Sequence, residues 1–240
     1  MHITFNTDTK IADDNFDTDK TVIVFVTNCI ELKPYGVSEC LENKYKHLRL
    51  FKERTALYST RRATLDTQSR PGDVKIYVQE GCPLFAALTS HYSVGPPIEE
   101  NKINLKKLDT SVDKTYVERL RQDTLVNRLS AFKQGLEKLW CYLSHRISNG
   151  TNINRIIFPV GSGVGLHNDT WFDKYYPILK EFASNTFSPN TINLVLVGPQ
   201  RKLDSSEIIP DEPVDLSPKK RKVATEVGEE EDKKKKKCLH

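Results

Sequence analysis

The sequence predicts an α/β domain of three layers, in which helices cover both faces of a central sheet. Strands are indicated by short runs crowded with β-branched and aromatic residues. Helical patterns lie between these runs, and strands that alternate with helices are typical of this layered architecture. The predicted strands are 3–5, 21–26, 73–79, 153–160 and 192–197, and the predicted helices are 37–45, 115–146 and 173–183.

The first half of the chain supplies the central strand. TVIVFV (21–26) is apolar at every position except its first, as expected of a strand covered on both faces. The helix at 37–45 follows, and Ser38 and Glu39 suit its first turn. A Pro71-Gly72 turn introduces the strand at 73–79, and PLFAALTS (83–90) is a further short apolar run.

The longest predicted helix, 115–146, has one apolar face. Its apolar residues recur at steps of three and four, which places them on the same side of a helix. These residues are Leu125, Leu129, Phe132, Leu136, Leu139 and Leu143.

After about residue 202 this patterning stops, and Pro, Asp, Glu, Ser and Lys dominate. Such a composition cannot bury enough apolar surface to fold. We therefore predict a domain at 1–202 and a disordered charged tail at 203–240.

Composition excludes several classes of protein. The longest apolar runs are far too short to span a bilayer, and the N-terminus lacks the features of a signal peptide, which predicts an intracellular protein without membrane contact. The five cysteines lie far apart with no CxxC pair, so neither a disulfide framework nor a metal site is expected. The net charge is only +4. This value is weak support for nucleic-acid binding, which we expect only as weak contact through the tail.

A glycine-rich loop, GSGVG (161–165), joins the strand at 153–160 to the helix at 173–183. Closely spaced glycines let backbone N–H groups approach an anion, and a helix N-terminus adds partial positive charge. The spacing fits neither the P-loop nor the GxGxxG dinucleotide fingerprint. On its own, the loop is equally consistent with a structural turn.

In its context the loop resembles that of the macro-domain family, in particular the phage and viral branch related to ADP-ribose 1''-phosphate phosphatases. IIFPVGSGVGLHNDTWFDKYYPILKEF is similar to the family's strand, glycine loop, tryptophan and helix. Further similar segments occur in the family's order: VFVTNCI, GVSECLENKY, LFKERT, SRPGDVKI, LTSHYSVGPP and DTLVNRLSAFKQGLEKL. The resemblance implies a three-layer α/β/α macro-domain-like fold with a mixed central sheet, and no cofactor.

The resemblance also implies a site for ADP-ribose or an ADP-ribosylated substrate. Asp8 corresponds to the carboxylate that receives the adenine amino group, and Asn28 to the amide that pairs with the distal ribose. Gly36, Val37 and Ser38 correspond to the loop beside that ribose, where Pro34 replaces a usual glycine. The diphosphate loop corresponds to Gly161, Ser162, Gly163, Val164 and Gly165.

Candidate catalytic groups are Asp169, His167 and His91, because activating water requires a carboxylate or an imidazole. The family's acid immediately before tryptophan is Thr170 here, and Asp169 is one place earlier. Each of the three also has a plain interpretation as a loop or surface residue.

The tail contains SPKKRKV, which resembles a monopartite nuclear-import signal. An import receptor and a nuclear location are therefore expected. The residues concerned are Pro218, Lys219, Lys220, Arg221, Lys222 and Val223.

Three functions stay open at this point. The first is an enzyme that hydrolyses ADP-ribose 1''-phosphate or removes ADP-ribose from proteins. The second is a non-enzymatic nuclear reader of ADP-ribose, and the third is a derived scaffold without a ligand.

Overall fold

The computed structural model describes residues 3–6, 18–57, 61–92, 97, 114–161, 170–186 and 192–198. By internal contacts the chain divides into Met1–Lys202 and Leu203–His240, and all described residues belong to the first unit. The predicted tail and its import signal lie outside the described residues.

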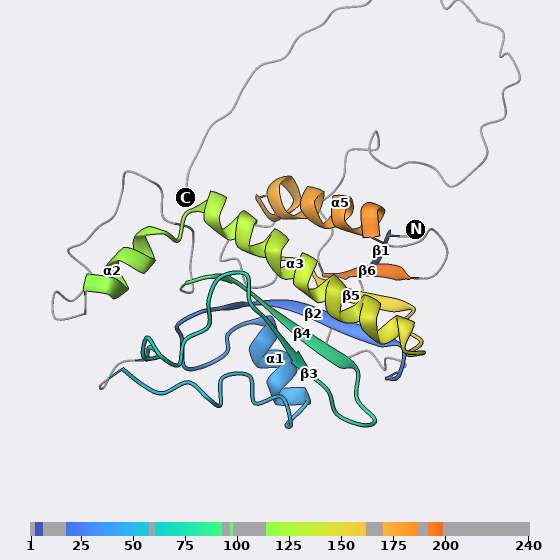
Figure 1. Ribbon diagram of the computed structural model, residues 1–240, viewed down its shortest axis with the longest axis horizontal. Helices are drawn as coiled ribbons and strands as arrows, with labels where there is room; N and C mark the ends of the chain where they lie inside the picture. Colours follow the sequence, from blue (N-terminus) through green and yellow to red (C-terminus); the bar gives the residue numbers. More distant parts are fainter. Residues whose placement is uncertain are drawn as a thin grey trace, which may run out of the picture. The chain divides into compact units, whose positions relative to one another are not determined.

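The centre of the fold is a six-stranded mixed sheet with the strand order β1-β6-β5-β2-β4-β3 (Figure 1). All neighbouring strands are parallel except β3, which runs antiparallel to β4. The predicted α/β architecture with a mixed sheet is confirmed. The strands are β1 (Ile3–Asn6), β2 (Thr21–Asn28), β3 (Val74–Tyr77), β4 (Leu84–His91), β5 (Arg155–Pro159) and β6 (Asn193–Val197).

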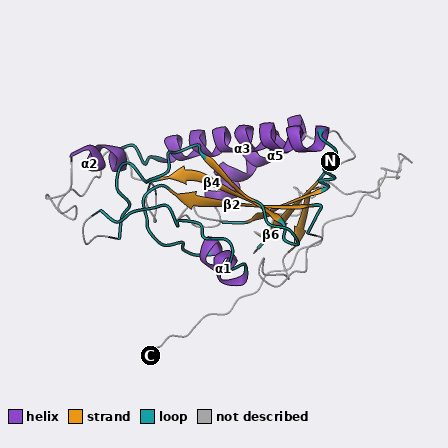
Figure 2. Ribbon diagram, turned by 60° about the horizontal axis from the view of Figure 1, so that its bottom comes forward, coloured by secondary structure: helices purple, strands orange, loops and turns teal. Residues whose placement is uncertain are grey.

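Helices cover both faces of this sheet. The helices α3 (Leu125–Ser148) and α5 (Tyr176–Thr186) lie on one face, and α1 (Val37–Lys44) lies on the other (Figures 1 and 2). We call these the α3 face and the α1 face. This arrangement gives the three predicted layers.

The central strand β2 is buried along its whole length, as predicted. Val22, Val24 and Val26 belong to the core on the α3 face, with residues of α3 and α5. Ile23 and Phe25 belong to the core on the α1 face, with Leu41 of α1. Successive side chains of a strand point to opposite faces of the sheet. Each face of β2 is therefore covered by its own apolar core.

The predicted helix at 115–146 is wrong as one continuous element. It is two helices, α2 (Lys114–Arg121) and α3, separated at 122–124. Thr124 has extended backbone angles and caps α3, since its hydroxyl accepts a hydrogen bond from the N–H of Asn127 over 3.3 Å. The apolar face that supports the predicted helix begins only at Leu125, and no apolar residue lies between Leu120 and Leu125, so the periodicity does not extend across this interruption. Within α3 the predicted apolar face is confirmed, and Phe132, Leu136, Leu139 and Leu143 are buried.

The last predicted helix begins with a different geometry. Residues Trp171–Tyr175 form a π-helical turn, η2, which continues directly into α5. Trp171 and Tyr175 are fully buried in the core of the α3 face. Wide turns of this kind occur frequently near functional sites.

Candidate ligand-binding site

Two neighbouring strands end beside each other at the predicted site. β2 and β5 are parallel partners, joined through Thr21–Ile23 and Arg155–Ile157. Their carboxyl ends, Asn28 and Pro159, therefore lie at the same edge of the sheet. We call this the carboxyl edge.

The connections that leave these two strands diverge. The chain after β2 leads to α1, whose Leu41 packs on the α1 face. The chain after β5 leads to η2 and α5, whose Trp171 and Leu179 pack on the α3 face. Neighbouring strands whose connections go to opposite faces create the topological switch point at which α/β folds bind ligands.

Asn28 ends β2 next to an irregularity in the sheet. Thr27 pairs with Thr89, whereas Asn28 pairs with His91, so β4 contains one extra residue at this point. Such bulges redirect side chains at the ends of strands. The Asn28 side chain is largely buried, and its Oδ1 accepts hydrogen bonds from Glu31 N over 2.8 Å and from Arg54 Nη1 over 3.2 Å.

The predicted loop at Gly36 to Ser38 begins α1. Gly36 is exposed, has a φ of +59° and precedes the helix without a side-chain cap. Ser38 is buried and donates its hydroxyl to the carbonyl of Tyr35 over 2.8 Å, while Val37 is half-buried. The serine hydroxyl is therefore engaged in the turn, and the first-turn backbone N–H groups of α1 have no acceptor within the helix.

At the end of β5 the described chain stops at the first glycine of the predicted diphosphate loop. Gly161 has a φ of +71°, in the left-handed region that glycine adopts without strain. Ser162, Gly163, Val164, Gly165, His167 and Asp169 lie outside the described residues, as does Asp8.

Gly198, which the sequence did not single out, permits a close approach beside Gly161. A Cβ at position 198 would lie 3.2 Å from the Cβ of Val160. Its backbone is also in the positive-φ region, at +138°. The end of β6 thus packs closely against the start of the glycine loop.

His91 is the one predicted catalytic residue that the structure describes. It is 3% exposed, and its Nδ1 lies 3.1 Å from Ser90 Oγ. Burial, together with the charges of Arg128 and Arg54, lowers the pKa of His91 to about 3. The ring is therefore neutral at physiological pH and is enclosed beside Asn28.

Cys29 follows Asn28 and is fully buried. Burial raises the pKa of this thiol well above its ordinary value. A buried, protonated thiol is a core side chain and not a nucleophile. In the described part of the chain, no group of three or more His, Cys, Asp or Glu could hold a metal ion. Among the described helices, none is long and apolar enough to cross a membrane.

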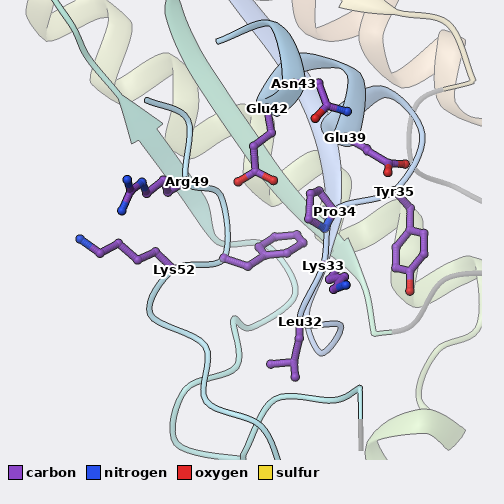
Figure 3. A pocket seen from close by; sticks show the side chains of 10 residues that line it. Leu32, Lys33, Pro34, Tyr35, Glu39, Glu42, Asn43, Arg49 and Lys52 are labelled. Atoms are coloured by element: carbon purple, nitrogen blue, oxygen red, sulfur yellow. The ribbon is translucent and has the colours of Figure 1, made fainter. Parts of the chain in front are cut away.

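A pocket of about 530 Å³ is lined by the loop that follows β2, by α1 and by the segment after α1 (Figure 3). Its walls combine apolar side chains with both signs of charge, and the described lining residues come from the connection between β2 and β3. The lining residues are Leu32, Lys33, Pro34, Tyr35, Glu39, Glu42, Asn43, Arg49, Phe51 and Lys52.

Neither a protein-family model nor a curated protein matches the chain. Solved structures do resemble it. A protein of unknown function from Bacteroides thetaiotaomicron is 14% identical, with a TM-score of 0.47 over 82% of this chain and 98% of that chain. A macrodomain protein from Streptomyces coelicolor is 8% identical, with a TM-score of 0.38 over 83% and 100% of the two chains.

A macrodomain mutant from Oceanobacillus iheyensis, in a structure with ADPR, is 13% identical, with a TM-score of 0.40 over 81% of this chain and 82% of that chain. Macrodomain proteins are thus among the structural neighbours of this chain. With TM-scores below 0.5, these likenesses assign it neither a family nor a ligand.

Proposed function

We propose that this chain binds ADP-ribose at the carboxyl edge, between the connections that follow β2 and β5. The observation that carries this proposal is the position of Asn28. It ends β2 at a topological switch point, directly beside the strand that leads into the glycine loop at Gly161. The sequence resemblance to macro domains names the ligand class.

Each part of the ligand has a proposed partner. Backbone N–H groups of residues 161–165 receive the diphosphate, since such groups and a following helix N-terminus favour anions. The Asn28 amide and the start of α1 at Gly36 receive the distal ribose. Asp8 receives the adenine amino group.

Hydrolysis of ADP-ribose 1''-phosphate, or removal of ADP-ribose from a protein, is the finer proposal. It requires a group that accepts a proton from water, and Asp169 with His167 are the candidates. The enclosed position of His91 favours a packing role for that ring. Binding without turnover therefore defines the alternative, a reader of ADP-ribose.

The tail contributes the proposed location. Residues 218–223 have the composition of a signal read by an import receptor, which suits a reader or hydrolase that acts on nuclear proteins. A nuclear function is thus part of the proposal and is tested separately from binding.

Calorimetric titration with ADP-ribose tests the proposed binding. The comparison is between the wild type, Gly163→Glu and Val78→Glu. Val78 is 60% exposed and follows β3 at the opposite edge of the sheet, so its variant adds the same charge away from the site. Binding by the wild type and Val78→Glu, with at least a tenfold loss in Gly163→Glu, supports the proposal. No binding by the folded wild type contradicts it and leaves the ligand-free scaffold.

A further inference from the structure

The Arg54 guanidinium is built into the loop that follows β2. Its Nη2 donates to the backbone carbonyl of Asn28 over 2.6 Å and to Ser69 Oγ over 3.1 Å. Its Nη1 donates to the backbone carbonyl of Glu31 over 2.5 Å and to Asn28 Oδ1 over 3.2 Å. One side chain thus ties together the end of β2, the next turn and a distant loop.

The plane of this guanidinium is fixed from a further side. It lies over the ring of Phe51, with its central carbon 3.7 Å from the ring centroid. Burial lowers the pKa of Arg54 to about 10, so the group remains charged at neutral pH. Stacking and carbonyl contacts compensate a half-buried cation in a way that suits a planar guanidinium.

These contacts determine which way the Asn28 amide faces. An amide oxygen has two lone pairs, and Glu31 N and Arg54 Nη1 occupy both. A flipped amide would place its NH₂ group against two donors. The NH₂ group is therefore turned away from Arg54, and no residue in the described part of the chain accepts a hydrogen bond from it.

We infer that Arg54 is a positioning residue, which holds the Asn28 amide so that its NH₂ group faces the ligand and selects a hydroxyl or phosphate oxygen there. This inference rests on the proposed function. It adds that recognition of the distal part of the ligand depends on a residue that does not itself touch the ligand.

Lysine cannot replace Arg54 in this role. A single ammonium group lacks the planar fork that reaches four acceptors on three segments. Arg54→Lys therefore keeps the charge but loses the geometry. Arg49 is exposed and lines the pocket shown in Figure 3, and within the described residues no hydrogen bond joins its side chain to Asn28, so Arg49→Lys is the matched control.

Affinities for ADP-ribose and ADP test the inference, because ADP lacks the distal ribose. Arg54→Lys should weaken ADP-ribose binding about tenfold, which is the effect of losing one charge-assisted hydrogen bond. Its affinity for ADP should stay within twofold of the wild-type value. Asn28→Ala should have the same effect, and the double variant should lose little more. Arg49→Lys should match the wild type for both ligands.

Three results would overturn the inference while the proposed function stands. The first is an unchanged affinity of Arg54→Lys for ADP-ribose, and the second is an equal loss of its affinity for ADP. The third is a double variant whose loss of ADP-ribose affinity is the product of the two single losses. If Arg54→Lys does not fold, Ser69→Ala removes one acceptor of Nη2, and it should weaken ADP-ribose binding about twofold to threefold. An unchanged affinity in Ser69→Ala would then count against the inference.

A second readout needs no ligand. The side-chain NH₂ signals of Asn28 can be assigned in a ¹⁵N–¹H spectrum by their loss in Asn28→Asp. Arg54→Lys should move them toward the position of a free amide, and Arg49→Lys should not. If the wild type fails to bind ADP-ribose while Arg54→Lys still moves these signals, only the proposed function is contradicted. Unmoved signals contradict the positioning role.

Discussion

Asp123 and Arg128 form a two-point ion pair in which both side chains are 1% exposed. Arg128 Nε lies 2.9 Å from Asp123 Oδ1, and Nη2 lies 2.6 Å from Oδ2. Asp123 Oδ1 also accepts a hydrogen bond from the N–H of Tyr92 over 3.1 Å. The pair thereby joins the break before α3 to the chain just after β4.

Removing one partner of this pair should strongly destabilise the fold. Arg128→Met leaves a buried carboxylate without its cation, and losses of about 3–5 kcal/mol are typical of such changes. The free energy of unfolding in urea measures the effect. Lys138→Met is the control, because Lys138 pairs with Asp73 over 3.2 Å on the surface and should change stability by less than about 1 kcal/mol. Similar losses in the two variants would contradict the importance of burial.

Two glycine substitutions should have opposite effects on stability. Gly36 has a φ of +59°, and a Cβ there meets no atom within 4 Å, so Gly36→Ala is opposed by backbone strain alone, about 1–2 kcal/mol. Gly135 lies within α3, and its Cβ would make an ordinary contact 3.5 Å from Leu88 Cδ2.

Gly135→Ala should therefore stabilise the protein by up to about 1 kcal/mol, since alanine is the better helix former. The free energy of unfolding of both variants, measured in denaturant, shows whether each substitution stabilises or destabilises the protein. A destabilised Gly135→Ala would show that α3 packs more tightly against β4 than these contacts indicate.

Because of His91, the free energy of unfolding should decrease as the pH falls below about 6.5. The pKa of His91 is about 3 in the folded protein against an ordinary value of 6.5, so the unfolded chain binds more protons between these values. Above pH 6.5 the ring is neutral in both the folded and the unfolded chain, and its contribution to stability is fully present. It is lost as the pH falls toward 3, by up to about 1.4 kcal/mol per pH unit.

Unfolding free energies between pH 7 and pH 4 test this prediction. His91→Gln should have a shallower pH dependence than the wild type in this window. His145→Gln makes the same replacement at an exposed position of α3 and serves as the matched control. Equal slopes in all three proteins would mean that His91 accepts a proton without unfolding.

Asp169→Ala separates the proposed hydrolase from the reader. As a hydrolase, the wild type should release phosphate from ADP-ribose 1''-phosphate, or ADP-ribose from a modified protein, and Asp169→Ala should lower the rate about 100-fold or more, the usual contribution of a general base. Binding of ADP-ribose should stay within a few fold. Absence of turnover by a wild type that binds would leave the reader.

Nuclear import should depend on the basic residues of the tail. Replacing Lys219, Lys220 and Arg221 with alanine in a fluorescent fusion should shift the protein from the nucleus to the cytoplasm, as measured by the ratio of the two signals. Alanines in the terminal lysine run, 233–237, keep the import motif and serve as the control. A nuclear signal that survives the first change and not the second would assign import to the terminal lysines.

Local patterns were sufficient for most elements of the fold. The apolar run at 22–26 predicted a covered central strand, because apolar residues at adjacent positions of a strand indicate burial on both faces. The predicted single helix missed the break at 122–124, although no apolar residue lies between Leu120 and Leu125 and Thr124 is a favoured N-cap residue. The pairing of Asp123 with Arg128 at this break is not expressed in the local pattern.

For the proposed site, the sequence pointed to Asn28 and the glycines through their resemblance to the macro-domain family. Arg54 was visible only as part of the LFKERT segment, with no sign that it contacts Asn28. These residues are far apart in the chain, and only the folded loops bring them together.

The sequence by itself determined the layered α/β class, the apolar faces of its helices and the glycine loop, since these follow from local spacing and residue chemistry. Only the tertiary structure decided the strand order, the diverging connections at Asn28 and Gly161, the enclosure of His91 and the direction of the Asn28 amide. Each of these depends on contacts between distant segments, and their energies come from burial and hydrogen-bond geometry that no short stretch contains.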